Sequence, residues 1–177
     1  TFTVVLGHGL KHIYLAAFSI LIPEIKVGLN LSNAAVGALA TAQDASGGIS
    51  TLWAGFIADR FASRWSIILS MSMVLLGFGF FLSGAFPNYW MILVALVGAS
   101  IGVSLWHPAA IASLAIRYPH RLGFALSLHG TGGNIGDVLG PLIAGGLLLV
   151  VAWQHLLQFS LIPALVTAFF VWMILKG

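Results

Sequence analysis

The chain has 177 residues, of which 60% are hydrophobic and only 6% are charged, and its mean hydropathy is +1.07. This composition leaves too little polar surface to cover a water-soluble globule, so it excludes the soluble classes and indicates an integral membrane protein. The formal net charge of +3 comes from seven basic residues scattered along the chain, which form no patch that would bind nucleic acid.

Long apolar segments recur along the whole chain, and a membrane-spanning helix needs about 20 mostly apolar residues. The fold class predicted is therefore an all-α membrane protein with six transmembrane helices. Their expected ranges are 2–27, 33–58, 65–86, 88–116, 123–151 and 155–175. The breaks carry turn and capping residues, such as Ser32 before the second helix and Pro87 with Asn88 before the fourth.

The basic residues favour one orientation in the membrane. If the N-terminus is cytoplasmic, only Lys26 falls on the outer side, and five basic residues fall on the inner side. These five are Arg60, Arg64, Arg117, Arg121 and Lys176. The sequence thus predicts a multi-pass protein of the cell inner (cytoplasmic) membrane with a cytoplasmic N-terminus.

An internal repeat appears when the sequence is shifted by 85 positions. Pro23 then falls on Pro108, Gly47 and Gly48 fall on Gly132 and Gly133, and Gly55 falls on Gly140. We expect one bundle over residues 1–177, built from repeats at about 1–86 and 87–177. Three helices per repeat make the second copy inverted in the membrane, which is a 3+3 inverted repeat.

The segment Gly55-Phe-Ile-Ala-Asp59-Arg60-Phe-Ala-Ser-Arg64 resembles the signature of the loop between helices two and three in the major facilitator superfamily, with Ala62 in place of the second glycine. The resemblance implies half of a major facilitator fold, with a cytoplasmic gate at Gly55, Asp59, Arg60 and Arg64. The alternative is an ordinary basic inner loop, which explains the arginines but not a glycine and an aspartate at this spacing.

A second resemblance narrows the family. The segments Trp106-His107-Pro108, Gly132-Gly133-Asn134-Ile-Gly136-Asp137 and Gly140-Pro141-Leu are similar to segments of fosmidomycin-resistance-type efflux proteins. The resemblance implies an N-terminal six-helix half of a secondary active transporter that drives proton-coupled efflux of a small organic molecule. Lys11, His12 and Ala109 stand where that family has Asn, Asp and Glu, which leaves the assignment of the coupling residues open.

The fifth predicted helix carries small residues at intervals of four. Gly132, Gly136 and Gly140 form a face on which another helix can pack closely in lipid, with Pro141 beside the last of them. The functional alternative is that Gly140 and Pro141 belong to an antiporter motif that bends this helix.

Polar and ionisable residues within the spans are the candidate substrate or ion-coupling site, because charges in the bilayer are costly. The candidates are Lys11, His12, Asp44, His107, Asn134 and Asp137. We expect Lys11 to pair with Asp44 or Asp137, and the surplus aspartate to carry a proton. The alternatives are a structural ion pair and interhelical hydrogen bonds from the histidines.

No enzyme, cofactor or metal site is predicted. The sequence holds no nucleophile elbow, P-loop or HExxH motif. His8 and His12, four positions apart on one helix face, are able to bind zinc in principle, but the sequence places no third ligand beside them.

Transporters of this superfamily use two six-helix halves, and this sequence holds one. Three hypotheses remain: the efflux transporter or its N-terminal half, a symporter that imports a small organic anion attracted by Lys11, and a half-transporter fold that serves as a structural subunit of a larger membrane complex. We expect a second six-helix half or another membrane subunit to cover helices one, two, four and five, and membrane lipid to cover helices three and six. Substrate, coupling ion and direction stay open.

Overall fold

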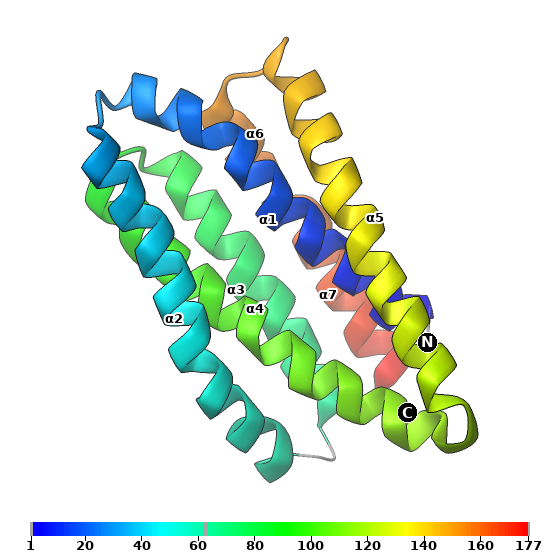
Figure 1. The fold of residues 1–177 in the computed structure, drawn as a ribbon. Helices are drawn as coiled ribbons and strands as arrows, with labels where there is room; N and C mark the ends of the chain where they lie inside the picture. Colours follow the sequence, from blue (N-terminus) through cyan, green and yellow to red (C-terminus); the bar gives the residue numbers. More distant parts are fainter. Residues whose placement is uncertain (1, 62–63, 177) are drawn as a thin grey trace.

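The structure, a computed structural model, describes residues 2–61 and 64–176, and within these ranges it is entirely helical (Figure 1). The helices are α1 (Phe2–Gly28), α2 (Asn33–Arg60), α3 (Trp65–Ala85), α4 (Tyr89–Arg117), the short 3₁₀ helix η1 (Pro119–Arg121), α5 (Leu122–Leu148), α6 (Trp153–Phe159) and α7 (Leu161–Leu175). Ala62 of the loop signature lies outside the described residues. The predicted helices are confirmed, and their ends move by a few residues.

The turns at one end of the bundle are fixed by capping side chains. Ser32 Oγ accepts a hydrogen bond from the amide of Ala35 at 3.1 Å, and Asn88 Oδ1 accepts one from the amide of Met91 at 3.0 Å. Both bonds satisfy amides that a helix N-terminus leaves without a partner. Asn30, between α1 and α2, has a φ of 51°, a left-handed conformation that asparagine tolerates better than most residues.

The sixth predicted helix is one apolar segment of the chain but is broken at Ser160 into α6 and α7. Pro163 explains the break, because it has no amide hydrogen for the carbonyl of Phe159 and its ring crowds that carbonyl. Tyr14 donates its hydroxyl hydrogen to the carbonyl oxygen of Ser160 at 2.5 Å. The predicted helix over 155–175 is therefore confirmed as one helical span, Trp153–Leu175, which is interrupted at the single residue Ser160.

The helices pack as two pairs, α1 with α5 and α2 with α4, and α3 joins the second pair to the α6–α7 segment. α1 lies along α5, α2 lies along α4, and α3 packs between α4 and the α6–α7 segment (Figure 1). A shift of one repeat exchanges the first two pairs, since it replaces α1 by α4 and α5 by α2. The core contains Trp106, Met73 and Phe80, which are almost completely buried. The start of α1, the C-terminal end of α2, the N-terminal end of α3 and the α4–α5 connection lie at one end of the bundle.

Four segments of the described chain are long and apolar enough to cross a membrane: α1, α3, α4 and the combined segment Trp153–Leu175. α2 and α5 have 28 and 27 residues, which is sufficient length, but their mean hydropathy is lower. Asp44 and Asp137 lie within these two helices. The two helices with an acidic residue near their middle are thus the ones that a hydropathy criterion alone does not find.

Helices three and six, which are both expected to face lipid, differ in how much apolar surface they expose. α7 exposes large apolar side chains such as Phe169 and Phe170, as a helix in contact with lipid does. α3 is the most buried of the four apolar segments, because α4 and the α6–α7 segment cover most of it. Its uniformly apolar sequence does not distinguish burial in protein from contact with lipid.

The glycines of α5 allow close contact with α1. A side chain at Gly136 would overlap the backbone oxygen of Gly9, and one at Gly140 would approach the backbone oxygen of Ile13 to 2.7 Å. Gly132 lies against the backbone of Val5 in the same way. Gly55 on α2 behaves differently, since no atom of the described chain lies near the place of its missing side chain.

Candidate functional site

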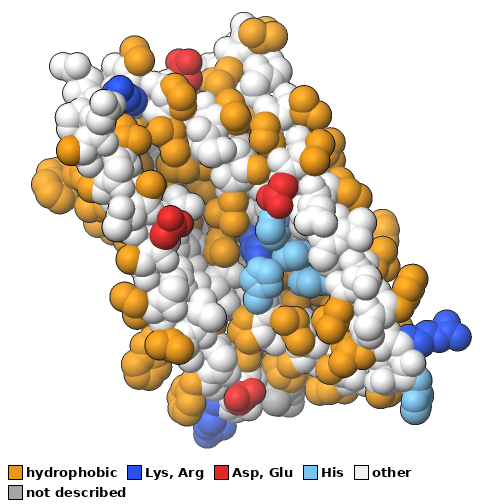
Figure 2. All heavy atoms as spheres, viewed as in Figure 1, with side chains coloured by type: hydrophobic (Ala, Val, Ile, Leu, Met, Phe, Trp, Pro, Cys, Tyr) orange, Lys and Arg blue, Asp and Glu red, His pale blue; other side chains and the backbone are white. Residues whose placement is uncertain are grey.

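Histidine, lysine and acidic side chains gather near the middle of one face of the bundle (Figure 2). These are His8, Lys11 and His12 of α1, His107 of α4, and His129 and Asp137 of α5. We call this set the polar cluster. The close packing of α5 on α1 brings His8, His12, His129 and Asp137 together, and α4 supplies His107.

Lys11 is the most deeply buried charged residue of the cluster, with only 1% of its surface exposed. Its Nζ lies 2.5 Å from Nε2 of His107, to which it donates a hydrogen bond. Among the described residues it forms no ion pair with Asp44 or Asp137, so the expected pairing is wrong. The reason is rotation: successive residues of a helix point about 100° apart, so His12 points toward α5 while Lys11 points toward α4.

A chain of contacts links His12 to α5. Nδ1 of His12 lies 2.8 Å from Oδ1 of Asp137, in an ion pair if the imidazole is protonated. Nε2 of His12 lies 3.1 Å from Nε2 of His8, and Nδ1 of His8 donates to the backbone oxygen of His129 at 2.7 Å. Asp137 is therefore in direct contact with a histidine, and it acts on the Lys11 ammonium only through space, without an ion-pair contact.

The ring of His129 stacks on the ring of His8, with 3.7 Å between their centroids. His129 is 5% exposed, and neither of its ring nitrogens has a hydrogen-bond partner within the part of the chain that the structure describes. A buried imidazole normally has such a partner, so His129 is an exception among the buried polar side chains of the described residues. The sequence analysis left His8 and His129 out of the candidate set.

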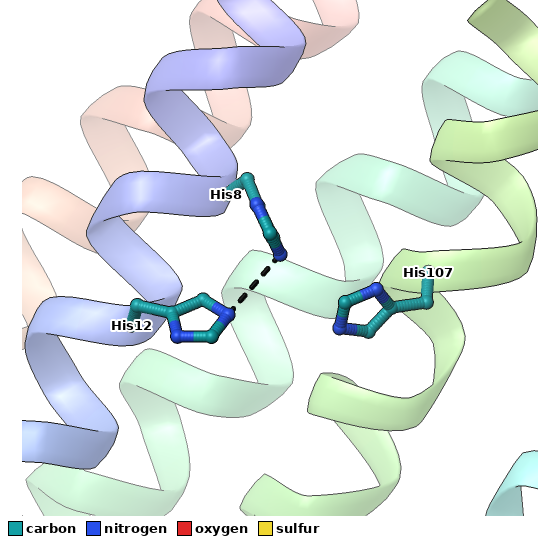
Figure 3. A group of neighbouring side chains, drawn as sticks. All are labelled: His8, His12 and His107. Carbon is teal, nitrogen blue, oxygen red and sulfur yellow. Dashed lines mark hydrogen bonds between the residues drawn. The ribbon is translucent and has the colours of Figure 1, made fainter. Parts of the chain in front are cut away.

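Three of the histidines point toward one another (Figure 3). His8 and His12 come from successive turns of α1, and His107 comes from α4. Each offers a ring nitrogen, and these nitrogens lie within 4.8 Å of one another. The sequence placed no third ligand beside His8 and His12, because that ligand comes from a helix almost 100 positions away.

A hollow of about 540 Å³ lies beside the cluster, between α2, α4 and α1. Its lining includes Asp44 and Gln43 of α2, Ser104 and His107 of α4, and Leu15 of α1. His107 thus belongs to both the polar cluster and the hollow. Asp44 is exposed there, and no hydrogen bond or ion pair holds it among the described residues.

The other candidate residues lie apart from the cluster. Asn134 is exposed on α5, and Pro141 lies one residue beyond the contact of Gly140 with α1. In the loop signature, Asp59 is exposed, and Arg60 lies over the ring of Phe61 at 5.6 Å. Arg64 precedes α3 and caps no backbone amide with its side chain. No ion pair joins the signature residues in the described part of the loop.

Comparison with known proteins gives a consistent family. A sequence profile of the Major Facilitator Superfamily matches residues 4–177. The chain is 34% identical over 91 residues to the fosmidomycin resistance protein of Escherichia coli, covering 51% of this chain and 22% of that protein. It is 29% identical over 168 residues to a probable 4-methylmuconolactone transporter of Cupriavidus pinatubonensis, covering 92% of this chain and 39% of that protein.

A third relative is an uncharacterized MFS-type transporter of Mycobacterium tuberculosis, 27% identical over 138 residues, which cover 75% of this chain and 23% of that protein. The matched part of the chain therefore covers 22% to 39% of the length of these relatives.

The fold is also similar to that of a solved structure. This is a bacterial homolog of the human lysosomal transporter Spinster, in an inward-facing and unoccupied conformation. The TM-score is 0.81 at 19% identity, and the match covers 97% of this chain and 41% of the other. Since the profile spans nearly the whole sequence and the helices form half of that fold, the chain belongs to the Major Facilitator Superfamily.

Proposed function

We propose that this chain is the N-terminal six-helix half of a secondary active transporter that moves a small organic molecule out of the cell in exchange for protons. The observation that carries the proposal is the hollow of about 540 Å³ beside the polar cluster, on a face where charged and imidazole groups lie near the middle of the helices. Such groups within a membrane domain are typical of substrate and ion pathways.

Asp44 is the proton carrier in this proposal. Asp137 has His12 as its partner, whereas Asp44 lines the hollow with no partner among the described residues. When Asp44 gains a proton, it loses its charge. A charged Asp44 is costly to enclose in the membrane interior, so the hollow closes more readily when Asp44 is protonated. The buried Lys11 is engaged by His107 and is not open to an incoming anion, so nothing here favours the anion symporter.

The proposal also includes the orientation of the chain in the membrane and a second six-helix half as its partner. Five of the six basic residues near the helix ends lie at the end that carries the N-terminus, which supports a cytoplasmic N-terminus in the inner membrane. Asp59, Arg60 and Arg64 lie at this end, where the gate would be. Because Asp59 has no ion pair within the described residues, its partner in a gate would come from the second six-helix half.

The test uses the full-length protein in proteoliposomes that contain a pH-sensitive dye. Fosmidomycin and 4-methylmuconolactone, which appear in the names of two relatives, are added as probes. We expect one of them to move protons across the membrane, and Asp44→Asn to abolish that movement. Glu24→Gln, an exposed carboxylate at the far end of α1, is the matched control and should leave it unchanged. Transport without proton movement, or full activity in Asp44→Asn, contradicts the proposal.

A further inference from the structure

The hydrogen bonds of the polar cluster determine where the ring hydrogens of two histidines lie. Nδ1 of His8 faces a backbone carbonyl oxygen, and Nδ1 of His12 faces a carboxylate oxygen. Both oxygens only accept hydrogen bonds, so each Nδ1 carries a hydrogen, and in the neutral ring the lone pair is on Nε2. The two Nε2 atoms nevertheless lie 3.1 Å apart. Two lone pairs at this distance repel unless a positive charge lies close to both.

A metal ion fits this geometry. Metal–nitrogen bonds to zinc are about 2.0 to 2.1 Å long, so a tetrahedral ion holds two nitrogen ligands about 3.3 Å apart. The observed separation of the two Nε2 atoms, 3.1 Å, is close to this value. We propose that His8, His12 and His107 bind a divalent transition-metal ion of the Zn²⁺ class.

The outer contacts of these histidines support the proposal. A histidine that binds a metal usually donates its other ring N–H to a carboxylate or a backbone carbonyl, which fixes the ring and its tautomer. Asp137 accepts this bond from His12, and the backbone oxygen of His129 accepts it from His8. Asp137 also supplies a negative charge beside the ion. Both α1 ligands therefore have the outer partner that a metal site requires.

His107 completes the site from α4. Its ring points toward the other two (Figure 3), and the three ligand nitrogens lie within 4.8 Å of one another. Binding requires the exposed His107 side chain to turn until its nitrogen reaches bonding distance. Three protein ligands leave a fourth position for water or a small ligand, and imidazole nitrogens suit zinc, copper and nickel.

Lys11 opposes binding in the native protein. Its ammonium donates to Nε2 of His107 at 2.5 Å, so an ion that uses this nitrogen must displace a buried positive charge. Lys11 therefore acts as a tethered cation that competes with the metal. Its replacement by methionine, which has a similar length and no charge, removes both the competition for His107 and the repulsion between the two cations.

The test is isothermal titration calorimetry of the purified full-length protein with Zn²⁺, after any polyhistidine tag has been removed. We expect one ion per described chain. His12→Ala and His107→Ala should weaken binding by more than about 100-fold, and Asp137→Asn by about 10- to 100-fold. Lys11→Met should tighten binding by about tenfold or more. His155→Ala, on α6 and outside the cluster, is the control and should bind as the native protein does.

Co²⁺ gives a second measurement, because a tetrahedral site with three nitrogen ligands gives it a visible absorption that the aqueous ion lacks. His12 and Asp137 are partly exposed, so their variants are expected to fold. If neither the native protein nor Lys11→Met binds Zn²⁺, or if His12→Ala binds it unchanged, the proposal is rejected and the two Nε2 atoms share a proton. The measurement is of binding alone, so its result is independent of the transport proposal.

Discussion

At the scale of single residues, Tyr14 supplies a hydrogen-bond donor to the backbone where the sixth helix is interrupted. Its hydroxyl group is buried, and it donates to the carbonyl oxygen of Ser160 at 2.5 Å. The hydroxyl of Ser160 in turn donates to the carbonyl oxygen of Leu157 at 2.6 Å. Side chains thus satisfy carbonyl groups near a break in a helix, where water is scarce within a membrane.

We predict that Tyr14→Phe lowers the free energy of unfolding by about 1 to 2 kcal/mol, because a buried hydrogen bond is lost while the ring still fills its place. The measurement is unfolding in mixed detergent micelles, followed by tryptophan fluorescence. Tyr89→Phe is the matched control, since no hydrogen bond of the Tyr89 hydroxyl is found among the described residues. Equal stability of the two variants would mean that the Tyr14 bond contributes nothing.

The residues of the polar cluster were partly predictable. The sequence marks Lys11, His107 and Asp137 as ionisable residues within apolar segments, and the structure brings them to one place. Their pairing was not predictable, because it depends on how α1, α4 and α5 are rotated about their axes. The spacing of His8 and His12 placed both on one helix face, but nothing in the sequence indicated that His107 would reach them.

At the scale of helices, the α1–α5 pair depends on the glycines of α5. The spacing of four predicted a small-residue face, although the sequence did not name the helix that contacts it. The structure identifies α1 as that helix, and the contact places Asp137 beside His12. Close packing of these helices thus assembles four of the six members of the polar cluster: His8, His12, His129 and Asp137.

We predict that Gly136→Ala destabilises the protein by about 1 to 3 kcal/mol, because its methyl group overlaps the Gly9 oxygen and Cβ of His12. Gly146→Ala on the same helix is the control. Nothing lies near its missing side chain, so this change should be neutral or add up to about 1 kcal/mol through helix propensity. Both values come from unfolding in mixed micelles, and similar effects at the two positions would contradict the packing argument.

The broken sixth helix was also open to prediction. Pro163 lies inside the apolar segment, where proline removes a backbone hydrogen bond, but proline is common in membrane helices and often only bends them. Pro23, Pro108 and Pro141 lie inside α1, α4 and α5 without ending them. The position of a proline alone therefore does not decide whether a helix bends or breaks.

At the scale of the whole molecule, the bundle has two unlike surfaces. α7 presents apolar side chains, including Phe169, which is 55% exposed. The second surface is polar and carries Asp44, His107 and Asp137, which are all exposed in the isolated bundle. Hydrocarbon would penalise each of these polar groups, so this surface requires water or a protein partner. A second six-helix half meets that requirement, and the relatives have more than twice the length matched here.

Spin labels distinguish the apolar surface of α7, which is expected to contact lipid, from the polar surface at Asp44. The chain contains no cysteine, so a spin label is readily placed at Asp44→Cys or at Phe169→Cys in the full-length protein in lipid bilayers, after any cysteine elsewhere is replaced. Oxygen dissolves in lipid and a nickel chelate dissolves in water, and each broadens the spectrum of a label that it reaches. We expect oxygen to reach the label at Phe169 and the nickel chelate, or neither reagent, to reach the label at Asp44. Strong access of oxygen at Asp44 would place that surface in lipid, and a second half covering it would then be excluded.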